Sequence, residues 1–187
     1  RAFTLVELLA MGGLIWDSCR DRLRQRQLMQ AYLWGAVGAS TSAYVRYFLG
    51  MQTYWRRYAA PGFDPNDFGL ILSIAIPLGL YLSMAPGRMR WVYRAAILAV
   101  MFAILLTASR MAMVTAFAAF LFPALTWRQL DVGQRVASVM LVLLMILGLY
   151  KLAPATSRER LATFSAELTS GTLHNRTTIW KTGLKVL

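Results

Sequence analysis

A single arginine within a long apolar stretch constrains this chain more than any other feature. Between Ile97 and Leu125 the only charged residue is Arg110. One unbroken helix over 91–127 would be about 55 Å long, whereas the hydrocarbon core of a bilayer is about 30 Å thick. We therefore expect two helices joined by a tight turn at Ser109 and Arg110. A charge inside a bilayer is costly unless it faces protein or water, so Arg110 should lie at or just below a membrane surface.

The composition favours a membrane protein. Hydrophobic residues make up 58% of the 187 residues and charged residues only 15%, whereas about a quarter of a soluble domain is charged. The apolar residues form blocks about as long as a bilayer is thick. These features predict an all-α, polytopic transmembrane helix bundle with about six hydrophobic segments, roughly Ala2–Trp16, Leu28–Leu49, Phe68–Ala85, Trp91–Ala108, Met111–Trp127 and Val136–Ala153.

The distribution of arginines predicts the orientation of the bundle. A formal net charge of +12 is also typical of nucleic-acid-binding proteins, but these arginines lie between apolar blocks, so we expect no nucleic-acid partner. Three connections, 17–27, 86–94 and 127–135, hold nine arginines, and the opposite short connections hold three: Arg56, Arg57 and Arg110. Short cytoplasmic loops are enriched in Lys and Arg. The side of Arg110 should therefore be the outer, periplasmic side.

The segment 154–187 differs from the rest because it is polar and mixed in charge. Leu161, Phe164 and Leu168 recur at helical spacing, which predicts amphipathic helices lying on the membrane surface. We interpret this segment as the start of a large periplasmic loop. Because both ends of the sequence look cut, we interpret residues 1–187 as part of one membrane domain of a larger protein.

Four arginines are expected on the outer face, against the usual bias of charge, and they are the candidate substrate-binding residues: Arg56, Arg57, Arg110 and Arg176. A guanidinium keeps its charge and binds phosphate oxygens with two parallel hydrogen bonds. A snorkelling arginine without function is the alternative for Arg110. Cations collected near lipid depth suit a substrate with an anionic head and a lipid tail.

Other polar residues near these arginines have structural or chemical interpretations. Asp64, Asn66 and Asp67 follow Pro61 and Gly62 and can cap the next helix; they lack the further partners that a metal site needs. His174 is the only histidine and is either a general base or a solvated residue. The single cysteine, Cys19, excludes disulfides within these residues and cysteine-ligated zinc.

Three short motifs, taken in order, resemble the O-antigen ligase and O-antigen polymerase superfamily (Wzy_C type). Asp64–Phe68 reads DPNDF, similar to a helix start of that family. Leu106–Arg110 reads LTASR, similar to its Ser-Arg pair after a helix, and Arg176–Trp180 reads RTTIW, similar to its second arginine motif. The resemblance covers roughly 60–187 in motifs and the remainder in hydropathy only.

The resemblance implies a bacterial inner-membrane glycosyltransferase that acts on an undecaprenyl-pyrophosphate-linked glycan at the periplasmic face. Arginines of the family hold the pyrophosphate, which matches Arg110 and Arg176, and neither a metal nor a nucleotide cofactor is needed. The acceptor would be lipid A–core, a growing glycan or a protein. His174 does not match the family's catalytic His-Asn motif, so we expect the general base beyond residue 187.

Two further function classes remain open from the sequence. In a small-anion or solute transporter, Arg110 would line an anion route, although no repeat symmetry or broken helix is evident in the sequence. In a purely structural membrane subunit, the arginines would only anchor the bundle.

Overall fold

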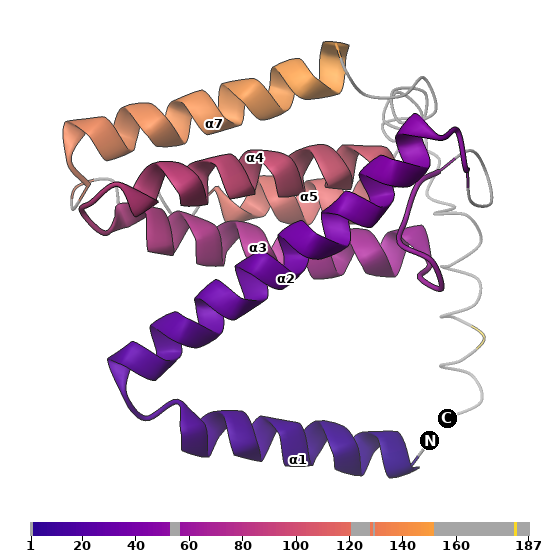
Figure 1. The fold of residues 1–187 in the computed structure, drawn as a ribbon, viewed down its shortest axis with the longest axis vertical. Coiled ribbons are helices and arrows are strands. Elements are labelled where there is room, and N and C mark those ends of the chain that lie inside the picture. Colours follow the sequence, from indigo (N-terminus) through magenta and orange to yellow (C-terminus); the bar gives the residue numbers. More distant parts are fainter. Residues whose placement is uncertain (1, 53–56, 121–127, 129, 152–181, 183–187) are drawn as a thin grey trace.

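The structure is a computed structural model that describes residues 2–52, 57–120, 128, 130–151 and 182, and within these residues it is helical, with no β-strand. Figure 1 shows helices α3, α4 and α5 packed together, with α2 crossing them and α7 along the other side of α4. The helices are α1 (Ala2–Ser18), α2 (Arg22–Phe48), α3 (Pro65–Met84), α4 (Met89–Thr107), α5 (Arg110–Ala119) and α7 (Val132–Lys151).

Helix α3 lies at the centre of the bundle and packs against α2, α4 and α5. Its start follows from local sequence, since Asp64 is the N-cap and Pro65 occupies the first turn, where a missing N–H costs nothing. Leu72 and Ile76 are fully buried along its length. Because α2, α4 and α5 all pack on α3, the position of α3 determines where the ends of these three helices lie.

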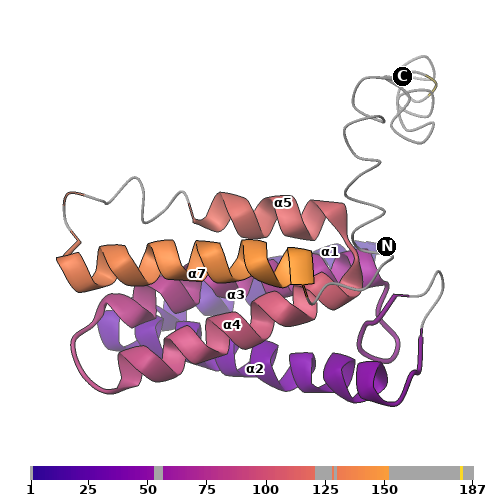
Figure 2. The same cartoon turned by 90° about the horizontal axis from the view of Figure 1, so that it is seen from above.

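Helices α4 and α5 form the reversal expected at Ser109 and Arg110. Helix α4 ends at Thr107, and its C-cap, Ala108, has a left-handed backbone (φ 50°, ψ 30°). Ser109 then caps α5, because its hydroxyl accepts a hydrogen bond from Ala112 N at 3.4 Å. Figure 2 shows α5 running back antiparallel to α4. Helix α5 packs mainly on α3, so the turn delivers Arg110 to the end of the bundle where α3 begins.

Helix α2 contributes one face to the core, and α1 lies apart from the bundle (Figure 1). Leu33, Ala36, Ser40 and Ala43 are the buried residues of α2, and their spacing of three to four places them on one stripe. The described side chains of α1, including Glu7, are exposed. Glu7 therefore does not face the interior of the bundle in the described structure.

The expectation of about six membrane spans is not supported. Among the described residues, only α3 and α4 are long and apolar enough to cross a bilayer. Arg110–Ala119 and Val132–Gly148 are shorter apolar helices, and α2 carries three arginines in its first two turns. Length and hydropathy thus identify two candidate spans among the described residues.

The arginine distribution predicts which loops lie at the same end of the bundle, and the contacts at each end agree with that grouping. At one end, Gln134 Nε2 donates to Met84 O at 2.8 Å, which joins the start of α7 to the end of α3. Figure 1 shows the α3–α4 connection and the start of α7 at that end. At the other end, Arg57 contacts Asn66 and Thr107. The arginine-rich connections and the Arg57–Arg110 side therefore lie at opposite ends of α3.

A close helix approach at Gly69 generates a stability prediction. A Cβ added at Gly69 would lie 2.7 Å from Ala112 Cβ and 3.0 Å from Thr107 Oγ1. Gly69→Ala should therefore destabilise the protein by about 1–3 kcal/mol through overpacking. Gly35→Ala is the matched control, since nothing lies within 4 Å of that position, and alanine in a helix should be neutral or stabilising by up to about 1 kcal/mol. Thermal unfolding in detergent measures the melting temperatures of the two variants. Equal melting temperatures would contradict the close approach of α3 and α5.

Candidate functional site

The candidate site is organised around Arg57, a buried arginine between α2 and α3. The residue is only 5% exposed. Its Nε donates to Thr107 O at 2.6 Å, and its Nη2 donates to Asn66 Oδ1 at 2.7 Å. These two acceptors are neutral, so they satisfy guanidinium donors without cancelling the charge. One side chain thus connects the loop before α3, the start of α3 and the end of α4.

The polar residues at the start of α3 have different roles, since one caps the helix and another binds Arg57. Asp64 Oδ1 accepts from Asn66 N at 2.7 Å, as expected of an N-cap. Asn66 instead directs its side-chain oxygen to Arg57. Asp67 lies in the first turn of α3 and is exposed, where a carboxylate is favoured by the helix dipole. The expectation that all three residues cap the helix is therefore confirmed for Asp64, while Asn66 binds the arginine.

The end of α4 is held by hydrogen bonds from the loop before α3 and by hydrogen bonds of Thr107 within the turn. Tyr58 N donates to Leu106 O at 3.1 Å, so the Arg57–Tyr58 segment binds two successive carbonyls of the last turn. Thr107 Oγ1 donates to Ile104 O at 2.7 Å and lies 3.2 Å from Ser109 N, from which it accepts. Thr107 and Ser109 are both buried. The backbone carbonyls that α4 leaves unpaired at its end thus find partners across the loop.

Arg110 follows directly after this turn, as the first residue of α5, and is partly buried. The first N–H groups of a helix and its dipole favour anions, and α5 presents this terminus beside the start of α3. The described structure therefore brings together four of the residues predicted from the sequence, Arg57, Asn66, Ser109 and Arg110, with Asp64 and Asp67 on the adjoining first turn. Arg56, His174 and Arg176 lie outside the described residues.

Two contributors to this site were not among the candidate residues from the sequence, although Thr107 lies within the LTASR motif. Thr107 acts through its carbonyl oxygen, which any residue has, and Gly69 allows Thr107 and Ser109 to approach α3. Small residues at close helix contacts are the only sequence feature that points to Gly69. Within the described residues, no group of three or more His, Cys, Asp or Glu side chains gathers as a metal site would require.

Comparison of the chain with protein-family models, with curated proteins and with solved structures found no match.

The contact between Arg57 and Asn66 can be measured with a double-mutant cycle. Asn66→Ala removes one acceptor, Arg57→Ala removes the hydrogen bonds to Asn66 and Thr107, and the double variant completes the cycle. We expect Arg57→Ala to cost about 2–3 kcal/mol of unfolding free energy, with a coupling energy of about 1–2 kcal/mol between the two positions.

Arg46→Ala is the control for the loss of an arginine, because its Nε makes only a long 3.4 Å bond to Met51 O at an exposed site. It should change the unfolding free energy by less than about 0.5 kcal/mol. Additive effects of Arg57→Ala and Asn66→Ala would contradict the described connection.

Proposed function

We propose that this chain is the membrane part of a glycosyltransferase that moves or polymerises an undecaprenyl-pyrophosphate-linked glycan, of the O-antigen ligase or polymerase type. The proposal places the chain in the bacterial inner membrane, with the Arg57–Arg110 end at the periplasmic face. The glycan acceptor would be lipid A–core, a growing glycan or a protein hydroxyl.

One observation carries the proposal. Two of the three motifs that resemble this superfamily, Asp64–Phe68 and Leu106–Arg110, meet in space although they are about forty residues apart in sequence. Arg57 connects them directly through Asn66 and Thr107. Motifs that resemble one family and converge at one end of a bundle favour a shared site over separate structural roles.

The geometry supports distinct roles for the two described arginines. Arg110 is partly buried at the start of α5, where a guanidinium and helix N–H groups can act on the same anion. Arg57 is buried and donates to neutral protein acceptors, which suits a residue that positions the loop and adds positive potential. We therefore assign pyrophosphate contact to Arg110, Arg176 and Arg56, with Arg57 in a positioning role.

In the proposed reaction, these cations stabilise the leaving group. Displacing a sugar from a pyrophosphate develops negative charge on the departing oxygens, and fixed guanidinium groups are already oriented to receive that charge. A general base would deprotonate the acceptor hydroxyl, and we place it outside residues 1–187. Direct displacement would invert the configuration at the anomeric carbon.

Arg110→Ala tests the proposed role in transfer. We expect glycan transfer to fall by at least about 100-fold, because a preorganised charge at the leaving group is lost, while the amount of protein in the membrane is unchanged. The assay follows product formation from a lipid-linked glycan in membranes that contain the protein in its full-length form.

The matched control is Arg128→Ala, which removes an exposed arginine from the connection before α7 and should leave transfer unchanged. Near-normal transfer by Arg110→Ala would refute the assignment. Anion or solute flux without any transfer by the unaltered protein would instead identify a transporter.

The orientation is tested separately by cysteine labelling. Cys19 is the only native cysteine, so Cys19→Ser provides a background into which Phe63→Cys and Met89→Cys are introduced one at a time. Phe63 and Met89 are about half exposed and lie at opposite ends of α3. A membrane-impermeant maleimide added to intact spheroplasts should label position 63 and reach position 89 only after lysis. The reverse pattern would place the Arg57–Arg110 end in the cytoplasm.

A further inference from the structure

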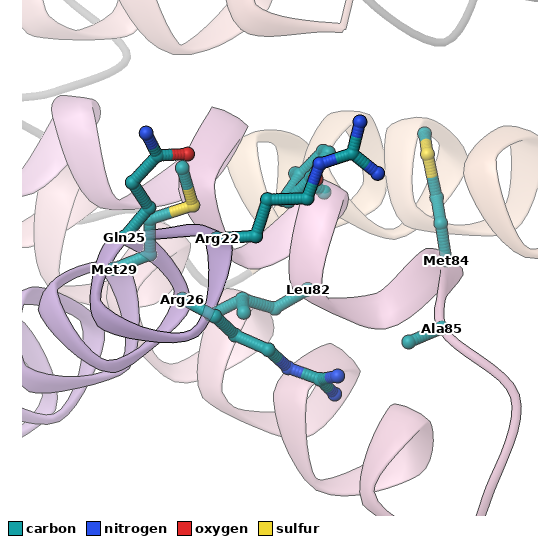
Figure 3. A pocket seen from close by; sticks show the side chains of 8 residues that line it. Arg22, Gln25, Arg26, Met29, Leu82, Met84 and Ala85 are labelled. Carbon is teal, nitrogen blue, oxygen red and sulfur yellow. The ribbon is translucent and has the colours of Figure 1, made fainter. Parts of the chain in front are cut away.

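A second site of positive charge lies at the opposite end of the bundle from Arg57. A pocket of about 620 Å³ opens between the first turns of α2 and the last turn of α3. This volume is within the usual range of ligand pockets, about 300–1,000 Å³. Figure 3 shows Arg22 and Arg26 extending from α2 toward Met84 and Ala85 at the end of α3.

The two arginines of this pocket differ from the neighbouring arginines of the chain in their ion-pair partners. Residues four apart on a helix lie on the same face, so Arg22 and Arg26 share one side of α2. Arg20 pairs with Asp17 at 2.7 Å, and Arg24 lies 3.8 Å from Asp21. Neither Arg22 nor Arg26 makes an ion pair with a carboxylate among the described residues. The local carboxylates thus serve the arginines outside the pocket, and two like charges remain together in it.

Apart from Gln25 and the hydroxyl of Tyr81, the rest of the lining is apolar. Met29, Leu82 and Met84 contribute to the wall, and Leu82 is almost completely buried. The pocket adjoins the end of α3, one of the two helices able to cross a bilayer. Trp91 follows on the next helix and is 61% exposed, and Arg90 and Arg94 lie 5.5 Å and 4.7 Å from its ring centroid. Exposed tryptophan beside arginine is typical of the depth of lipid headgroups.

A pair of guanidinium groups above an apolar wall, at headgroup depth, matches an amphiphile that carries a phosphate. Guanidinium binds phosphate oxygens bidentately, and basic pockets between membrane helices bind anionic headgroups. We propose that the Arg22–Arg26 pocket binds the phosphate headgroup of an anionic phospholipid in the leaflet at this end of α3. The inference requires α3 to cross the bilayer, but it does not depend on glycan transfer at the other end.

Native mass spectrometry of the full chain in a neutral detergent tests the proposal. Phosphatidylglycerol and phosphatidylcholine with identical acyl chains are titrated separately. We expect tighter binding of phosphatidylglycerol, and Arg22→Gln/Arg26→Gln should weaken it by roughly 10-fold to 30-fold, since each basic residue near an anionic lipid contributes a factor of roughly five. Both arginines are exposed, so the double variant should retain the helical content of the unaltered chain by circular dichroism.

Arg20→Gln/Arg24→Gln is the matched control, because it removes the same formal charge from the same region and leaves the pocket intact. It should change binding by less than about threefold. Equal losses in both double variants, or equal affinities for the two lipids, would overturn the site. Displacement of the lipid by an equal concentration of inorganic phosphate would assign the pocket to free phosphate and overturn the lipid as its occupant.

Discussion

The end of the bundle at which α3 begins depends on one buried guanidinium, that of Arg57. Removing an arginine from water is unfavourable unless its donors find acceptors within the protein. Arg57 meets this requirement with Thr107 O and Asn66 Oδ1, which belong to two different helix ends. Burial of this charge therefore requires the end of α4 and the start of α3 to stay together. Arg110 begins α5 three residues after Thr107, so its position depends on the same contact.

The local signals for helix ends were readable from the sequence. Asp64 indicated the start of α3, because aspartate is a preferred N-cap residue. The length of the apolar run indicated the turn at Ser109 and Arg110. The two side-chain caps are present, and the reversal between α4 and α5 is confirmed. These features depend on neighbours within a few residues, which is why a single sequence was sufficient to predict them.

Features that depend on distant partners were not predictable in the same way. The sequence near Arg57 indicated a surface cation, but the side chain is buried because an acceptor fifty positions later, Thr107 O, lies beside it. The expected number of about six spans is also not supported, since only α3 and α4 among the described helices are long and apolar enough to cross a bilayer. Hydropathy treated the apolar part of α2 as a separate segment, whereas the helix continues without a break back to Arg22 and includes four arginines. The proximity of the Asp64 and Arg110 motifs likewise depends on the three-dimensional arrangement, through the contacts of Arg57 with Asn66 and Thr107.

The two close approaches along α3 have a consequence for how that helix can move. Gly69 lies against Ala112 of α5, and Gly79 lies against Ile97 of α4 and Leu33 of α2. Each residue of an α-helix advances about 100° around the axis, so these two glycines point roughly 80° apart. A rotation of α3 about its own axis would push helix backbone and Cβ atoms into one neighbour while opening a gap at another. These contacts oppose rotation of α3 about its axis. A displacement at one end of α3 must therefore reach the other end by tilting or sliding of the helix.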